Sequence, residues 1–131
     1  MLRATLWALD NVFEAKASQS RQADATRIKG IAAAPGSYTG PVRVIMGEDE
    51  FEKIEAGDVL VCPITSPVWS VLFPSVGALV TDTGGILSHP AIIAREYGIP
   101  AVVATGNATA LIRDGQQIFV DGDAGVVRIL R

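Results

Sequence analysis

The residue of this sequence best suited to chemistry is His89, the only histidine in the chain. It follows a glycine pair, Gly84-Gly85, and stands directly before Pro90. A glycine pair permits a tight turn and close backbone approach, and proline suits the first turn of a helix, where its missing N–H is not needed. The pattern therefore predicts His89 at the cap of a helix, where backbone N–H groups and the helix dipole favour an anion. It indicates a nucleophile at a phosphate-sized site.

A phosphoryl-accepting imidazole needs only one histidine. The ordinary imidazole pKa of about 6.5 leaves much of the ring neutral near neutral pH, so that it can attack phosphorus. The phosphoramidate can then pass the group on, because protonation makes the ring a good leaving group. The protein must add a partner for the second ring nitrogen and donors for the phosphoryl oxygens. We expect these from Thr83, Ser88, the amides around Gly84 and Gly85 and, less directly, Arg95.

Each of these residues also fits an ordinary structural role. Taken separately, Ser88 suits a helix cap, Thr83 a turn, and Arg95 a solvated surface charge. The glycine pair suits a plain turn from strand to helix, and a lone histidine in apolar surroundings is more often structural than functional. Their convergence on one short stretch favours the phosphoryl acceptor.

Other chemistry is scarce in the sequence. With one histidine and one cysteine, Cys62, the chain cannot form a multi-histidine or thiolate metal site by itself, so we expect no metal. Neither a G-x-S-x-G elbow, nor a Walker A sequence, nor a dinucleotide fingerprint is present. We therefore expect no cofactor to be bound by this domain. Cys62 lies in an apolar run and is predicted to be a buried, inert thiol.

The elements that must position His89 are predicted to be a strand, a helix and a second strand. Residues 78–81 form a short apolar run that is typical of a buried strand, and 99–103 form another. Between them the helix opens at Pro90 and stops at Gly98. Its apolar side is expected to consist of Ile92, Ile93 and Tyr97, with Arg95 and Glu96 on the wetter side.

The rest of the sequence predicts several strands with only short helices between them. Residues 34–40 contain turn residues and predict a hairpin-like loop joining strands 28–33 and 41–46. The other predicted elements are strands at 59–62, 117–120 and 126–130, an acidic helix at 48–55 packing through Phe51 and Ile54, and a helix after Ser66-Pro67 held by Trp69, Leu72 and Phe73. This pattern favours a mixed α/β fold, in which a few short helices cover a mixed sheet, over a long doubly wound fold.

The N-terminal segment differs in texture from the rest. Residues 2–17 carry apolar side chains at helical spacing, and the polar stretch 18–24 is typical of a linker. We therefore predict an N-terminal helix and linker at 1–27 and one domain at 28–131. Two interpretations of the helix remain open: it packs on this domain's own core, or it contacts a neighbouring domain.

Composition limits the class of partner. The net charge is −3, and the sequence contains neither a basic stripe nor a basic tail, which argues against binding of nucleic acid or of an acidic membrane surface. The longest apolar runs are far shorter than a membrane span, and residues 1–9 do not resemble a signal peptide. We expect a soluble, cytoplasmic protein.

The segment around His89 resembles a known family. Residues 83–89 (TGGILSH) and 91–103 (AIIAREYGIPAVV) closely resemble the phosphohistidine, or mobile swivelling, domain of the phosphoenolpyruvate-utilising enzymes, which include phosphoenolpyruvate synthase, pyruvate phosphate dikinase and rifampicin phosphotransferase. The resemblance covers about 28–131, with further similarity at 30–36 (GIAAAPG), 40–44 (GPVRV), 57–61 (GDVLV), Trp69 and 121–125 (DGDAG). Pro90 departs from it, because a small residue such as alanine or glycine is common there.

The resemblance implies a compact β/β/α domain whose histidine, here His89, is transiently phosphorylated. It implies a phosphotransferase in which this domain moves between an ATP-grasp nucleotide-binding domain and a domain that binds pyruvate, phosphoenolpyruvate or an antibiotic. Those partners would act in cis or in trans, and ATP and Mg²⁺ would belong to the nucleotide-binding partner. An alternative hypothesis is a non-catalytic interaction or regulatory module that keeps the fold and anion pocket but is never phosphorylated.

Overall fold

The computed structural model describes residues 27–63 and 67–130 of the chain. The predicted helix at 2–17, its linker and the cap at Ser66 lie outside the described residues, and the domain boundary near 27 stays a prediction. The strands are β1 (Arg27–Lys29), β2 (Ile31–Ala34), β3 (Ser37–Val44), β4 (Val59–Cys62), β5 (Ala78–Thr81), β6 (Ala101–Val103), β7 (Gln117–Asp121) and β8 (Val126–Ile129). The helices are the 3-10 helices η1 (Glu48–Lys53) and η2 (Pro67–Leu72) and the α-helices α2 (His89–Tyr97) and α3 (Ala108–Leu111).

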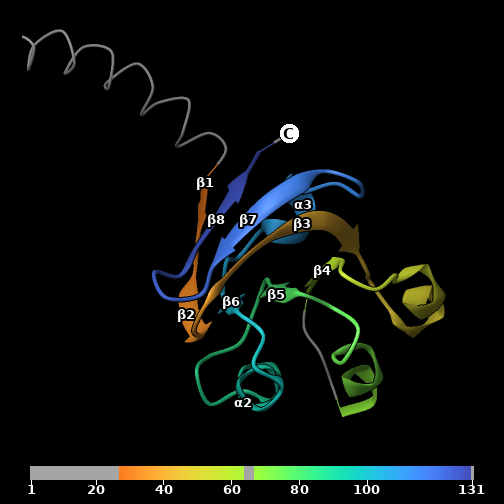
Figure 1. Ribbon diagram of the computed structural model, residues 1–131, viewed down its shortest axis with the longest axis horizontal. Coiled ribbons are helices and arrows are strands. Elements are labelled where there is room, and N and C mark those ends of the chain that lie inside the picture. Colours follow the sequence, from red (N-terminus) through yellow and green to blue (C-terminus); the bar gives the residue numbers. More distant parts are fainter. Residues whose placement is uncertain (1–26, 64–66, 131) are drawn as a thin grey trace, which may run out of the picture.

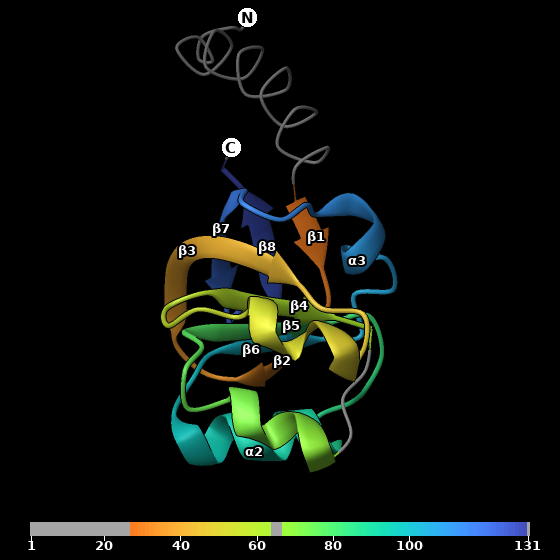
Figure 2. The same ribbon diagram turned by 90° about the vertical axis from the view of Figure 1, so that its right-hand side faces the viewer.

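The eight strands form one mixed sheet in the order β1-β8-β7-β3-β4-β5-β6-β2. Strands β3, β4, β5 and β6 run parallel to one another, and the remaining pairs are antiparallel. The long strand β3 joins the two halves, which fold over one another, and η2 and α2 cover the parallel half on its outer side (Figures 1 and 2). The structure thus has two β layers and one helical layer, which confirms the mixed α/β prediction.

Two hydrophobic cores follow from the alternation of side chains along the strands. On β4, Val59 and Val61 face the core between the two β layers, whereas Leu60 and Cys62 face the core beneath the helices. All four are fully buried, because this strand is covered on both sides. The predictions that Trp69, Leu72 and Phe73 anchor one helix and that Phe51 and Ile54 anchor another are confirmed.

The two ends of the sheet meet where β1 continues into β2 through Gly30. The Gly30 N–H donates to the carbonyl oxygen of Gly125 at 2.8 Å, and a Cβ at Gly30 would lie 2.5 Å from the carbonyl oxygen of Val103. A Cβ at Gly122 would overlap with the carbonyl oxygen of Ala34. Glycine is therefore required at this crossing by close approach of the backbone segments.

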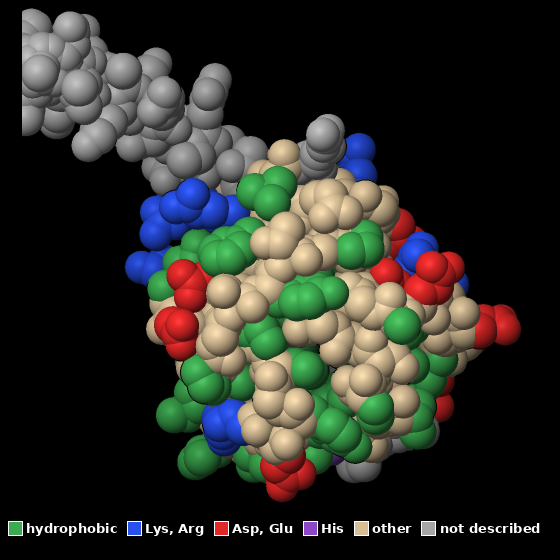
Figure 3. All heavy atoms as spheres, in the orientation of Figure 1, with side chains coloured by type: hydrophobic (Ala, Val, Ile, Leu, Met, Phe, Trp, Pro, Cys, Tyr) green, Lys and Arg blue, Asp and Glu red, His purple; other side chains and the backbone are tan. Residues whose placement is uncertain are grey.

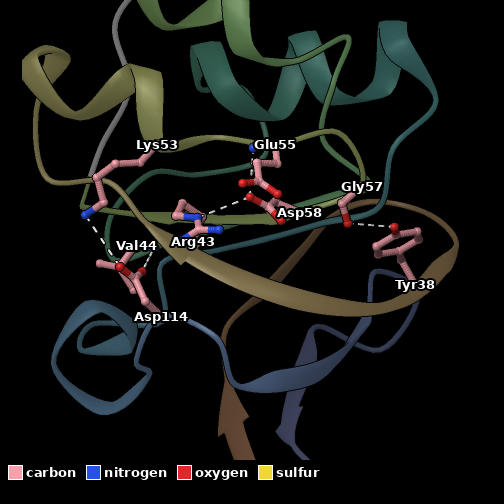
Figure 4. A network of polar contacts seen from close by, with 8 residues as sticks. All are labelled: Tyr38, Arg43, Val44, Lys53, Glu55, Gly57, Asp58 and Asp114. Carbon is pink, nitrogen blue, oxygen red and sulfur yellow. Dashed lines mark hydrogen bonds and ion pairs between the residues drawn. The ribbon is translucent and has the colours of Figure 1, made fainter.

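A network of polar contacts connects β3 with neighbouring turns (Figure 4). The buried carboxylate of Asp58 accepts hydrogen bonds from the Arg43 Nε at 3.2 Å and from the Glu55 N–H at 2.9 Å. The Tyr38 hydroxyl donates to the carbonyl oxygen of Gly57 at 2.7 Å. Nearby, Asp114 accepts from the Val44 N–H at 2.6 Å and lies 3.5 Å from the Lys53 Nζ. These contacts join β3, the turn before β4 and the turn before β7.

The predicted hairpin at 34–40 is wrong. Strand β3 starts at Ser37, and it pairs with β4 and β7, whereas β2 pairs with β6. Gly40 serves no turn: a Cβ there would lie 2.7 Å from Cε2 of the Tyr38 ring. Pro35 and Gly36, which has a φ of +107°, do form the connection between β2 and β3, whereas Gly40 is explained by the Tyr38 ring that packs against its backbone.

The predicted apolar side of the helix is also wrong in part. Pro90, Ala91 and Ala94 are the buried residues of α2, whereas Ile92 is 40% and Tyr97 50% exposed. Small side chains let α2 approach β2 and β6 closely, so the larger apolar residues lie at the margin. Ile93 packs against the helical-layer core, as predicted.

Candidate functional site

The candidate site lies between the end of β5 and the start of α2. Ser88 is the N-cap of α2, and the Ile92 N–H donates to the Ser88 carbonyl oxygen at 3.0 Å, which begins the helical hydrogen-bond pattern. His89 is the first helical residue and not the cap, one position further on than the sequence predicted. Pro90 lies in the first turn, as predicted. The ring of His89 is therefore presented at the positive end of the helix dipole.

The loop 82–88 that precedes His89 is shaped by its own hydroxyl groups. The Thr83 N–H and Oγ1 both donate to the Pro63 carbonyl oxygen at 3.1 Å, and the Thr81 Oγ1 donates to the Thr83 carbonyl oxygen at 2.6 Å. The Ser88 Oγ donates to the Gly85 carbonyl oxygen at 2.6 Å. In this conformation the hydroxyl protons of Thr83 and Ser88 are engaged with carbonyl groups and not with the imidazole.

Backbone donors next to His89 are left without partners. Within the described residues, no hydrogen bond is donated by the N–H groups of 84–87, nor by those of His89 and Ala91. Gly84 has a φ of +122°, which favours glycine, and a Cβ at Gly85 would meet nothing within 4 Å. Unpaired N–H groups at a turn and a helix N-terminus are what an anion needs in order to bind.

The imidazole of His89 is half-buried. Its Nε2 atom is buried and has no hydrogen-bond partner among the described residues. A buried polar atom without a partner is costly, so its presence in a structure asks for an explanation. The sequence predicted a hydrogen-bond partner for one ring nitrogen, and in this conformation Nε2 has none among the described residues.

Arg95 lies on the same helix as His89 but reaches elsewhere. Its Nη1 donates to the Ala33 carbonyl oxygen on β2 at 2.6 Å, and its Nη2 donates to the Ile86 carbonyl oxygen in the loop at 2.8 Å. Arg95 therefore contacts the loop 82–88 by a hydrogen bond to the loop's backbone at Ile86.

Sequence reasoning missed the residues that fix the end of β5. The Asp82 carboxylate accepts hydrogen bonds from the Thr109 N–H at 3.0 Å and from the Thr109 Oγ1 at 2.6 Å. The Thr105 Oγ1 donates to the Thr81 carbonyl oxygen at 2.9 Å. The available signal was an aspartate directly before the Thr83-Gly84-Gly85 turn. These bonds tie the start of the loop to α3 and to the segment after β6.

Cys62 is a free cysteine and is fully buried, as predicted. Burial, with a smaller contribution from the negative charge of Asp82, raises the pKa of its thiol far above the ordinary range. The thiol therefore stays protonated and unreactive in the folded protein.

The described part of the chain contains neither a cluster of metal-binding side chains nor a helix that could span a membrane. Residues 27–63 and 67–130 contain no group of three or more histidine, cysteine, aspartate or glutamate side chains placed to hold a metal ion. None of the helices in these ranges is long and apolar enough to cross a membrane.

Fold and site together define a class: a β/β/α domain that presents one histidine at a helix N-terminus, beside a glycine turn with unpaired backbone donors. Comparison of sequences identifies that class. The family described as "PEP-utilising enzyme, mobile domain" matches residues 54–125, more than half of the chain. The chain belongs to this family.

Its relatives are much longer proteins. The chain is 55% identical over 103 residues to the "Uncharacterized phosphotransferase YvkC" of Bacillus subtilis, covering 79% of this chain and 12% of the relative. It is 46% identical over 106 residues to a rifampicin phosphotransferase of Bacillus cereus, covering 81% and 12%. The chain therefore spans about an eighth of the length of each of these two relatives, and it corresponds to one domain of such phosphotransferases.

A solved structure supports the fold. The solution structure of an Enzyme I protein aligns with 61% of this chain and 33% of its own, with a TM-score of 0.55 and 34% sequence identity. The matching region is again one part of a larger chain.

Proposed function

We propose that this chain is a phosphoryl carrier in which His89 is transiently phosphorylated. The observation that carries the proposal is the position of His89 at the N-terminus of α2, beside backbone N–H groups without partners in the described residues. Membership of a family of mobile domains, and relatives that are phosphotransferases, support it.

The chemistry consists of two balanced steps. The lone pair of a neutral ring nitrogen attacks phosphorus, a nitrogen–phosphorus bond forms, and the phosphorus–oxygen bond to the donor's leaving group breaks. An acceptor oxygen later attacks the same phosphorus, and the imidazole leaves. The N–H groups of Gly84, Gly85, Leu87 and His89 are the proposed donors to the phosphoryl oxygens, because within the described residues they have no hydrogen-bond partner to give up.

The other predicted support residues act on the loop in this proposal. Thr83 and Ser88 fix its shape through their bonds to Pro63 and Gly85, and their oxygens still have lone pairs for an N–H of the ring. Pro90 removes one N–H from the first helical turn, so the proposed donors come from the loop and from His89.

The proposed partners are other domains. The nucleotide-binding domain would be of the ATP-grasp kind and would hold ATP and Mg²⁺, and the acceptor domain would bind pyruvate, phosphoenolpyruvate or an antibiotic, in cis or in trans. In this proposal the carrier itself holds no cofactor. Because free ATP is the expected phosphoryl source, we also propose a cytoplasmic location.

The arrangement of the strands suits a domain that moves. Strand β1 pairs antiparallel with β8, with Arg27 opposite Arg128, so the described chain enters and leaves the domain side by side. The free ends of these strands lie at one end of the molecule and α2 lies at the other (Figure 1). Rotation about this paired stem would therefore move the start of α2 farther than most of the domain.

The surface around His89 suits contact with another protein. Leu87 is 81% exposed, Ile86 52% and Ile92 40%, and all three lie within three residues of His89. Figure 3 shows hydrophobic side chains at the end of the molecule where Figure 1 places α2. Exposed apolar side chains gathered at one place are typical of interaction surfaces.

Labelling with a partner domain tests the proposal. The chain is incubated with ATP, Mg²⁺ and a nucleotide-binding domain of the proposed ATP-grasp kind. We expect one added phosphoryl group that is labile in acid and stable in base, that is absent in His89→Ala, and that is retained in Glu52→Ala, a control at an exposed residue. Label that persists in His89→Ala would refute the assignment.

The burial of Nε2 favours one competing function, a non-catalytic interaction module. That hypothesis predicts no label in the wild-type chain and a binding affinity for the partner domain that His89→Ala does not change.

A further inference from the structure

Arg95 connects three parts of the candidate site. Its side chain starts from α2, and its two terminal nitrogens donate to carbonyl oxygens of β2 and of the loop 82–88, at Ala33 and Ile86 respectively. Ala33 is only 3% exposed and belongs to the core beneath the helices, so the β2 end of this bridge is anchored at a buried residue.

The loop has little else to hold its outer part. The side chains of Ile86 and Leu87 are exposed, and the Gly85 carbonyl oxygen is bonded only within the loop, by Ser88. In the described part of the chain, the bond from Arg95 to Ile86 is the only side-chain hydrogen bond between residues 84–87 and a residue outside the loop.

We infer that Arg95 is a positioning residue, which holds residues 84–87 so that their N–H groups face the phosphoryl group on His89. This inference rests on the proposed function. A guanidinium group is suited to the task because its planar fork can donate in two fixed directions at once. A lysine ammonium keeps the charge but is a single point, so it cannot bridge two carbonyl groups in the same way.

The inference separates Arg95 from a residue that merely binds phosphate. If Arg95 were only a direct phosphate ligand, its replacement would leave the order of the loop unchanged before phosphorylation. A positioning residue orders the loop in the unphosphorylated chain, so its loss is visible without any phosphoryl donor.

The test compares Arg95→Gln, Arg95→Lys and a control, Arg128→Gln, in the 131-residue chain. Arg128 is an exposed arginine on β8, and its side chain forms no hydrogen bond or ion pair in the described part of the chain. Backbone ¹⁵N relaxation of residues 84–87 is measured without a phosphoryl donor. We expect lower order parameters in both Arg95 variants and wild-type values in Arg128→Gln. Wild-type order in either folded Arg95 variant would overturn the inference, and Arg95→Lys decides if Arg95→Gln does not fold.

A second readout connects loop order to the reaction. With phosphoramidate as a small phosphoryl donor, both Arg95 variants should be phosphorylated roughly 10- to 100-fold more slowly than wild type, since misplaced groups cost rates of this order. An unchanged rate would also overturn the inference. If even the wild-type chain is not phosphorylated by this donor or by the partner domain, the proposed function fails, and the relaxation result still decides whether Arg95 orders the loop.

Discussion

Glycines next to the strands and a glycine in the loop before His89 differ in what an added Cβ would contact. At Gly122 and Gly77 a Cβ would overlap with Ala34 and with the Tyr38 ring, so the packing of the chain on itself requires glycine. At Gly85 a Cβ would meet nothing within 4 Å in the described part of the chain. The fold therefore explains the first two glycines and leaves the third free for a role toward a group outside the chain.

The two regions also differ in how their backbone groups are satisfied. At the crossing in the sheet, the Gly122 N–H donates to the Gly36 carbonyl oxygen at 2.7 Å, and the Gly30 N–H donates to that of Gly125. In the loop, the N–H groups of 84–87 have no partner within the described residues. At the crossing these backbone N–H groups are hydrogen-bonded within the chain, whereas the N–H groups of the loop can still donate to a ligand.

The largest effect is expected from Gly122→Ala. The added methyl group meets backbone atoms, which cannot move aside as a flexible side chain would, so we expect a loss of about 3 kcal/mol or more in the free energy of unfolding. Urea denaturation followed by circular dichroism measures it. A loss below about 1 kcal/mol would mean that the crossing is looser than the structure shows.

Asp58→Ala should have the next largest effect. It leaves the Glu55 N–H and the Arg43 guanidinium without their buried acceptor, and we expect a loss of about 2 kcal/mol. Glu52→Ala is a suitable control, because the Glu52 side chain is exposed and forms no hydrogen bond or ion pair in the described part of the chain. Equal losses in the two variants would contradict the role given to Asp58.

Cys62 lies on β4, in the core beneath the helices, and tests whether this core is closed to water. Its thiol pKa is raised by burial, so the folded state keeps the proton that the unfolded state loses above the ordinary thiol pKa of about 8.5. Stability should therefore fall as the pH rises above that value, by about 1.4 kcal/mol per pH unit for this one proton. We expect Cys62→Ala to lack this part of the pH dependence. Identical slopes in the two proteins would show that the thiol reaches water in the folded state.

The smallest effect on stability is expected from Gly85→Ala. Nothing in the described chain opposes the methyl group, so the free energy of unfolding should change by no more than about 0.5 kcal/mol. Phosphorylation of His89 should nevertheless slow, because the methyl group occupies space needed by the phosphoryl oxygens. Gly122→Ala and Gly85→Ala thus separate stability from function. Normal phosphorylation of Gly85→Ala would contradict the difference drawn between the two glycines.

Elements with strong local signals could be predicted from the sequence. Strands 59–62 and 78–81 were predicted with the bounds that the structure shows, because each is a continuous apolar run buried on both faces. The start of α2 was predicted to within one residue, from the glycine turn and Pro90.

Features that depend on distant parts of the chain could not be predicted in this way. The pairing of β3 with β4 and β7, and the closeness of α2 that buries alanines, are set by tertiary packing. The same is true of Arg95, whose partner on β2 lies 62 residues away in sequence. A surface arginine and a bridging arginine have the same local sequence pattern.

The most direct test of the phosphoryl-acceptor proposal is an amide chemical-shift comparison of the ¹⁵N-labelled chain before and after treatment with phosphoramidate. We predict one added phosphoryl group on His89, together with large shifts of the amides of Gly84, Gly85, Leu87 and His89, while the amides of β7 and β8 stay unchanged. A His89→Gln chain should show neither change. Phosphorylation of His89 that leaves the loop amides unmoved, or no phosphorylation of His89 by either this donor or the partner domain, would contradict the proposal.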